Sequence, residues 1–209
     1  MYSLNEIDST AKRAARGIGL SWGMAEEVGK AARWLEGRGH AGVRLTALHL
    51  TQIDGRDHRL MYPQMTDEPW CAADGDLCPI ATGVTLSDLA RELDGPITLG
   101  AMAFPMLMLS HLALVSKQRG QAIQVSWPNA AFTVSNSGAV EGAAADVSRA
   151  DWVAVKSVAV TITDCDVNRP DHIDPKDWAT LERLGHRIFA PNTEHSRTAG
   201  AGAADDGAD

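Results

Sequence analysis

Cysteine is scarce in this chain: three residues among 209, an odd number without a close spacing pattern. This usage excludes a disulfide framework and fits a reducing cytoplasm. A structural zinc site needs a closer cysteine pair than Cys71 and Cys78, with further Cys or His ligands at regular spacing. We therefore expect no metal and no cofactor, and a buried thiol at Cys78. The anionic neighbours of Cys165 disfavour an activated thiolate there.

Long apolar runs and an excess of basic residues are also absent. The longest apolar stretch, around residues 101–115, is interrupted by Pro105, Ser110 and His111 and is too short to span a bilayer. No basic and apolar N-terminal segment resembles a signal peptide. The formal charge of −8 and a pI near 5.3 argue against nucleic acid or an anionic membrane as the main partner. We expect a cytoplasmic protein.

Common catalytic motifs are missing too. The chain has no nucleophile elbow, no phosphate-binding loop and no histidine pair with metal spacing. The glycines at 17, 19 and 23 have the wrong spacing for a dinucleotide fingerprint, and they follow a predicted helix instead of a strand. His111, on an apolar helix, is expected to be a core histidine whose hydrogen bonds are satisfied.

What the sequence does contain is a glycine-rich corner at residues 15–34, between two helical patterns. Ser3 and Glu6 form a capping box that predicts a helix from Leu4, and Gly17 is expected to end it in the left-handed conformation. Ser21 is the candidate N-cap of a second helix. In that helix an ion pair is expected between Glu26 and Lys30.

This corner is the first candidate site. Free N–H groups at a helix N-terminus attract anions, Arg16 adds a positive charge, and Glu27 is a candidate base. The alternative is a tight helix–helix corner, in which Trp22 and Trp34 are core residues. Gly23 is expected to pack closely, so that Gly23→Val overpacks the corner. The candidate ligand-binding residues of the corner are Arg16, Ser21, Trp22, Gly23 and Glu26.

The order of predicted elements favours an α+β fold. Helical patterns cover residues 42–53, a short segment capped by Ser87, the buried stretch 104–120 and residues 175–187, where Asp174 is the candidate N-cap. Strand patterns cover 96–99, 121–127, 131–136 and 151–164. Helices first and strands later predict a helical N-terminal half packed on a small antiparallel sheet, with a C-terminal helix. We expect one α+β domain over residues 1–190 and a glycine-rich tail over 191–209.

The tail is the second candidate site. A run of small residues can turn backbone N–H groups toward an anion, and a guanidinium can clamp a carboxylate at two points. His195 is the second candidate catalytic residue, because an imidazole titrates near neutrality. The alternative is a terminus without a role. The other candidate ligand-binding residues here are Glu194, Ser196, Arg197, Gly200 and Gly202.

Three stretches together resemble the bacterial family of domain of unknown function 3726. They are ARGIGLSWGMAEEVGKAARWL, LCPIATG with Asp88 after it, and RIFAPNTEHSRTAGAGA followed by aspartates. The resemblance implies that the glycine corner and the tail are recurring features, and it implies no activity. The chain closes in DDGAD where the resemblance implies Asp-Asn-Asp.

These observations predict a metabolic protein that binds a small carboxylate or another anionic ligand at the corner and the tail. As an enzyme it would transfer protons through Glu27 or His195, as in a lyase, isomerase or hydrolase. The alternatives are a non-catalytic small subunit that docks on a partner enzyme, and a structural homo-oligomer. Burial of Arg197 against the corner would favour the first hypothesis, and a projecting tail would favour the second.

Overall fold

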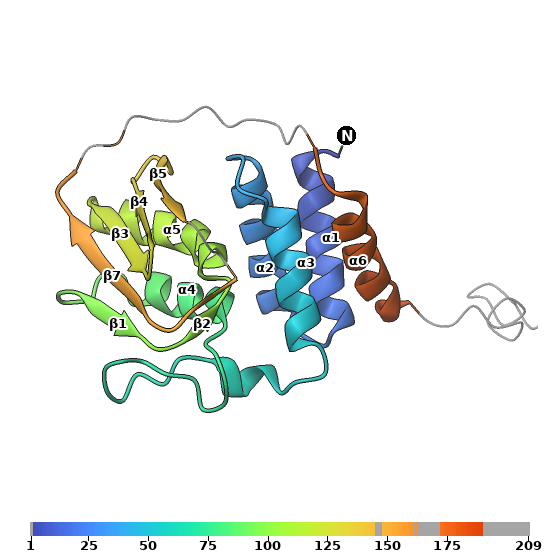
Figure 1. Cartoon of the computed structure of the whole chain (residues 1–209), viewed down its shortest axis with the longest axis horizontal. Coiled ribbons are helices and arrows are strands. Elements are labelled where there is room, and N and C mark those ends of the chain that lie inside the picture. The colour runs from blue at the N-terminus through green and yellow to red at the C-terminus, as the bar shows by residue number, and fades with distance from the viewer. Residues whose placement is uncertain (1, 145–147, 161, 163–171, 190–209) are drawn as a thin grey trace, which may run out of the picture.

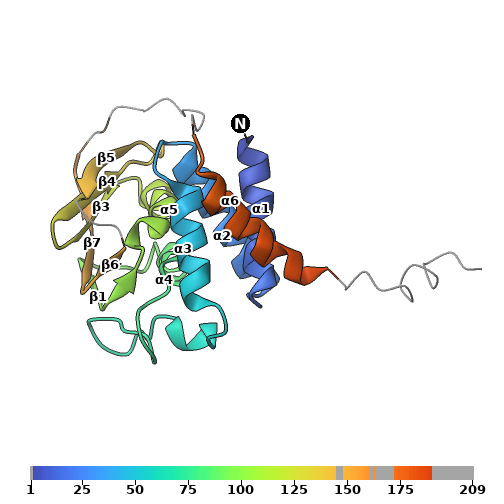
Figure 2. The same ribbon diagram turned by 45° about the vertical axis from the view of Figure 1, so that its right-hand side comes forward.

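A computed structural model describes residues 2–144, 148–160, 162 and 172–189, and its elements form three layers (Figure 1). The first layer consists of four helices: α1 (Leu4–Gly17), α2 (Trp22–Glu36), α3 (Gly42–Ile53) and α6 (Pro175–Gly185). Helix α2 packs against both α1 and α3, and α6 from the C-terminal part of the chain packs against α1 and α3. The middle layer consists of α4 (Pro79–Asp88) and α5 (Leu109–Arg119). Figure 2 shows α5 between the sheet and α3.

The third layer is an antiparallel sheet of five strands in the order β1-β7-β3-β4-β5. On the central strand β3, Val125 pairs with Phe132 of β4 on one side and with Val155 of β7 on the other. A separate two-stranded ribbon joins β2 to β6. The bounds are β1 (Ile97–Leu99), β2 (Met102–Ala103), β3 (Ala122–Trp127), β4 (Ala130–Val134), β5 (Val140–Ala144), β6 (Arg149–Ala150) and β7 (Val153–Val158). The predicted α+β class is confirmed.

Helix α5 is buried on several sides, although Leu114 and Lys117 are exposed. It contacts α2 on one side, α4 on another, and β3 and β4 across the sheet. Leu109, Leu112 and Val115 are almost fully buried. Gly120 ends the helix at φ 66°, as the sequence pattern predicts. The short 3-10 turns of the chain are η1 (His58–Met61), η2 (Pro105–Met108) and η3 (His186–Ile188).

The helix starts agree with the capping signals in the sequence. The Ser3–Glu6 capping box is complete, with Ser3 N–H donating to the Glu6 carboxylate over 2.6 Å. Ser21 accepts from Met24 N–H, and Asp174 accepts from Lys176 N–H. Helix α3 has no side-chain cap of its own at Ala41. A side chain at the end of α2 caps this helix instead: the Glu36 carboxylate accepts a hydrogen bond from Val43 N–H over 2.8 Å.

Two helix details of the sequence analysis are wrong. Gly17 does not take the left-handed conformation: the turn after α1 uses Gly19, at φ 93°. Gly17 is needed for a different reason, since a Cβ there would overlap the carbonyl of Leu184 on α6. Ser87 does not cap a helix. It lies near the end of α4, where its hydroxyl donates to Val84 C=O, because Pro79 starts the helix two turns earlier.

Strand β5 was not predicted, because its sequence VEGAA has little apolar alternation. It forms through pairing with β4, where Val134 lies opposite Val140 and Phe132 lies opposite Gly142. Cys78 is buried as expected, whereas Cys71 is exposed. No helix within the described ranges combines the length and apolar character that a membrane span requires.

Candidate functional site

The residues predicted for the corner point in different directions. Arg16 donates to the Leu20 carbonyl and stacks on Trp22, with its guanidinium carbon 4.6 Å from the ring centroid. Trp22 is 63% exposed, so the expectation that it is a core residue is wrong. Gly23 is exposed, and nothing lies within 4 Å of a Cβ built there. The expectation that Gly23 packs closely is therefore wrong.

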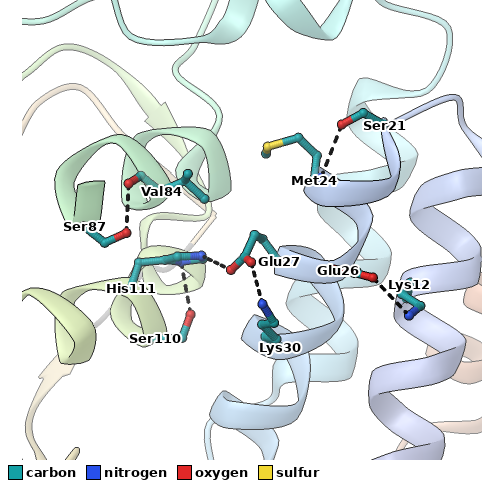
Figure 3. Close-up of polar contacts among 10 residues, drawn as sticks. All are labelled: Lys12, Ser21, Met24, Glu26, Glu27, Lys30, Val84, Ser87, Ser110 and His111. Carbon is teal, nitrogen blue, oxygen red and sulfur yellow. Dashed lines mark hydrogen bonds and ion pairs between the residues drawn. The ribbon is translucent and has the colours of Figure 1, made fainter. Parts of the chain in front are cut away.

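The close approach between α1 and α2 occurs six residues further on, at Gly29. A Cβ at Gly29 would lie 2.7 Å from a carboxylate oxygen of Asp8 and 2.8 Å from its backbone carbonyl. The predicted pairing of Glu26 with Lys30 is also wrong. Glu26 lies 3.7 Å from Lys12 of α1, while Lys30 donates to Glu27 over 2.7 Å. Figure 3 shows Glu26 and Glu27 on opposite sides of α2.

Of the residues predicted for the corner, Glu27 is the one that lies in a candidate site. Its second carboxylate oxygen lies 3.1 Å from Nε2 of His111 on α5, although the two residues are 84 positions apart. His111 is 2% exposed, and its Nδ1 lies 3.2 Å from the hydroxyl of Ser110 (Figure 3). The expectation that His111 is a buried histidine with satisfied nitrogens is confirmed. Its partner Glu27 lies too far away in the sequence for spacing to indicate the pair.

The charge state of Glu27 follows from these contacts. The hydrogen bond from His111 lowers the pKa of Glu27 to about 2; partial burial opposes this effect and the hydrogen bond from Lys30 adds to it. Glu27 is therefore ionised at neutral pH and can only accept hydrogen bonds. In turn, the hydrogen bond to Glu27 raises the pKa of Lys30.

Helix α4 holds the imidazole from the other side. A Cβ at Gly83 would lie 2.8 Å from Cβ and 2.9 Å from Nδ1 of His111, so only glycine lets α4 pack this closely. Gly83 is the last residue of the LCPIATG stretch. Two of the stretches singled out in the sequence therefore converge on His111: the corner supplies Glu27, and LCPIATG supplies Gly83.

The Glu27–His111 pair borders a pocket of about 280 Å³, which we name the α2–α5 pocket. Lys30 and Trp34 share the face of α2 that carries Glu27, and Arg38 follows just beyond the helix end. Leu114 and Lys117 share the face of α5 that carries Ser110. The turn between β4 and β5 closes the pocket. Its lining residues are Glu27, Lys30, Trp34, Arg38, Ser110, His111, Ala113, Leu114, Lys117, Asn136, Ser137 and Gly138.

Arg38 ties the helical layer to the sheet at one end of this pocket. Its Nε donates to the carbonyl of Gly138 over 2.8 Å, and its guanidinium carbon lies 4.1 Å from the centroid of Trp34. Gly138 has φ 88°, a backbone conformation that favours glycine. The pocket wall is therefore held by contacts from three layers.

The lining is basic in an acidic protein. Lys30, Arg38 and Lys117 contribute three cations, against the single carboxylate of Glu27. Trp34 and Leu114 add apolar surface, and Leu114 is 48% exposed. A larger cavity of about 490 Å³ beside Gly120 and Val158 has no charged or imidazole side chain in its lining. The α2–α5 pocket thus combines cations, apolar surface and a histidine–carboxylate pair.

The other predicted site residues lie elsewhere. The N-terminal end of α2, with Arg16, Ser21, Trp22 and Gly23, does not line the α2–α5 pocket, and neither does Glu26. The tail candidates Glu194, His195, Ser196, Arg197, Gly200 and Gly202 lie outside the described residues, as does Cys165. Their roles stay predictions. Within the described ranges, no three His, Cys, Asp or Glu side chains are grouped as a metal site would require.

Comparison with known proteins gives one match. Residues 2–74 match the family described as "Protein of unknown function (DUF3726)". The resemblance is confirmed for this segment, which contains the corner and Glu27. The likeness expected at LCPIATG and in the tail lies beyond the matched residues. No curated protein and no solved structure matches the chain.

Proposed function

Residues 2–74 match the DUF3726 family, and we propose that the chain binds a small carboxylate in the α2–α5 pocket. The observation that carries this proposal is the charge of the lining, where three cations surround one carboxylate in a chain of formal charge −8. Clefts lined by one sign of charge concentrate ligands of the opposite sign.

The individual cations support a carboxylate ligand to different degrees. Lys30 is occupied by Glu27, and Arg38 is held by Gly138 and Trp34. Lys117 is exposed, and it makes no ion pair within the described part of the chain. Lys117 is therefore the cation best suited to receive the ligand. Trp34 and Leu114 suit an organic body in place of a bare inorganic anion.

The Glu27–His111 pair supports proton transfer as the chemistry of the pocket. An imidazole oriented by an ionised carboxylate is a common general base and acid. In this arrangement Glu27 orients His111 through the 3.1 Å contact, and His111 carries the proton. We therefore propose an enzyme that transfers protons through His111, with Glu27 holding the imidazole in position.

The test is calorimetric titration with glutarate, benzoate and inorganic phosphate against the full chain. We expect glutarate to bind, and Lys117→Met to weaken binding about tenfold or more, since a charge-assisted hydrogen bond contributes about 1.5–3 kcal/mol. The matched control is Lys156→Met, which removes the same charge from exposed β7 outside the pocket. Equal affinities for all three proteins, or no binding of either carboxylate, would contradict the proposal.

A further inference from the structure

Ser110, His111 and Glu27 form one chain of hydrogen bonds with a defined direction. Because Glu27 can only accept, Nε2 of His111 must carry the hydrogen in the 3.1 Å contact. In the neutral imidazole, Nδ1 is then the acceptor. In that neutral form the Ser110 hydroxyl donates the 3.2 Å hydrogen bond to Nδ1. A hydroxyl that donates to an imidazole held by a carboxylate is the arrangement that activates a serine nucleophile.

The packing keeps this chain in place. His111 is 2% exposed and lies against Gly83, where there is no room for a Cβ atom. The imidazole can therefore accept the proton of the Ser110 hydroxyl without changing its position. Ser110 is itself 9% exposed and lines the α2–α5 pocket, so a molecule in the pocket contacts this residue.

The pocket also sets the charge of the molecule that would meet Ser110. Lys117 lies seven residues after Ser110 on the same face of α5, about 10 Å along the helix at 1.5 Å per residue. A carboxylate held at Lys117 leaves room for a short carbon chain that ends at Ser110. Trp34 and Leu114 line the space between with apolar surface.

We propose that Ser110 is a catalytic nucleophile that hydrolyses small esters whose acyl group carries a carboxylate. This inference rests on the proposed function, because it uses the same pocket and the same ligand charge.

The reaction proceeds through an acyl-enzyme and balances as an ester hydrolysis. Ser110 Oγ bonds to the acyl carbon while its proton passes to Nδ1 of His111, and Glu27 stabilises the imidazolium. The bond from the acyl carbon to the alcohol oxygen breaks, and that oxygen takes the proton from Nδ1. Water then adds to the acyl carbon and gives one proton to Nδ1. The bond to Oγ breaks, and Ser110 recovers that proton, which leaves an acid and an alcohol.

The experiment uses the full chain with the mono-para-nitrophenyl ester of glutaric acid, and para-nitrophenyl butyrate as the uncharged comparison. We expect the charged ester to react faster than the neutral one. We also expect mass spectrometry of the quenched reaction, or of the chain treated with a fluorophosphonate, to find the adduct on Ser110. Ser110→Ala should lower the rate at least about 100-fold. Ser126→Ala, on β3 outside the pocket, is the matched control and should leave the rate unchanged.

Each outcome has one meaning. An adduct on Ser110 together with the loss in Ser110→Ala supports the proposal, and Ser110→Cys should still form an adduct. Hydrolysis without an adduct, or an adduct on another residue, overturns it and reduces Ser110 to orienting His111. If glutarate binds in calorimetry but neither probe reacts, the nucleophile proposal fails while the proposed function stands. If glutarate does not bind either, both fail. Should Ser110→Ala not fold, adduct mapping on the wild-type chain decides alone.

Discussion

Gly83 of α4 lies so close to His111 of α5 that a Cβ atom on the glycine would stand 2.9 Å from the imidazole Nδ1. Real Cβ atoms do not approach other atoms this closely, so any larger residue at this position must displace either the imidazole or α4. The glycine therefore determines where the imidazole lies relative to Glu27 and Ser110.

Gly83→Ala should destabilise the protein by about 1–3 kcal/mol, because overpacking outweighs the gain in helix propensity. It should also move the imidazole away from Glu27. Urea unfolding measures the first effect, and the nitrogen chemical shifts of His111 in NMR measure the second. The matched control is Gly23→Ala, a helical glycine with nothing within 4 Å of its built Cβ. Unchanged His111 shifts in Gly83→Ala would contradict the prediction.

The crossing of α1 and α2 gives a second prediction, in which two glycines of one helix behave differently. Gly29→Ala should cost about 1–3 kcal/mol, since its Cβ would lie 2.8 Å from the Asp8 carbonyl. Gly23→Ala should be neutral or stabilise by up to about 1 kcal/mol, because alanine favours the helix and meets no neighbour. Denaturant midpoints of the two variants and the wild type provide the comparison. Equal midpoints for the two variants would show that the crossing tolerates a methyl group.

The lowered pKa of Glu27 predicts a stability change in acid. Its folded-state pKa is about 2 and its ordinary value is 4.5, so the unfolded chain binds the proton more readily. The stabilisation is fully present above about pH 4.5 and is lost as the pH falls toward 2. Glu27→Gln removes this contribution. The difference in unfolding free energy between wild type and Glu27→Gln should therefore shrink steadily over that window, as measured by urea titration at several pH values. A constant difference would refute the assignment.

A substitution at Thr82 is expected to stabilise the protein, unlike Gly83→Ala and Gly29→Ala. The Thr82 hydroxyl is buried and has no hydrogen-bond partner among the residues that the structure describes. Leaving a polar group unsatisfied in this way costs about 1–3 kcal/mol, and valine has nearly the same shape as threonine. Thr82→Val should therefore raise the free energy of unfolding by about 1 kcal/mol or more. Thr180→Val, at a partly exposed position of α6 where the hydroxyl donates to Lys176 C=O, should not stabilise. A less stable Thr82→Val protein would mean that the hydroxyl has a partner, such as a buried water.

The helices could be predicted because their signals are local. The Ser3–Glu6 capping box, Ser21 and Asp174 each lie within three residues of the N–H groups they cap. Glu26 and Glu27 show the limit of such reasoning. From the spacing, either carboxylate could pair with Lys30 on the same helix. Glu26 instead forms an ion pair with Lys12, because α1 packs beside it. Strand β5 depends in the same way on its neighbour β4.

The candidate site could be predicted only in part. Glu27 is named in the sequence as a candidate base, but its partner lies 84 positions away on a helix that reads as core. One signal was present: Glu27, Lys30 and Trp34 recur on one face of α2, and Ser110, Leu114 and Lys117 recur on one face of α5. Which two faces meet is decided by α5 packing between α2 and the sheet, and local sequence carries no information about that contact.

The return of α6 to the first helical layer has a consequence for synthesis. The helices α1, α2 and α3 leave the ribosome first, while α6, which packs on α1 and α3, follows only after residues 54–174. Until then α6 cannot cover the strip of α1 around Gly17, where Leu184 packs in the folded chain. The newly made chain must keep this strip unpaired while the sheet forms. A fragment limited to residues 2–74 lacks α6, and it should therefore self-associate more strongly than the full chain.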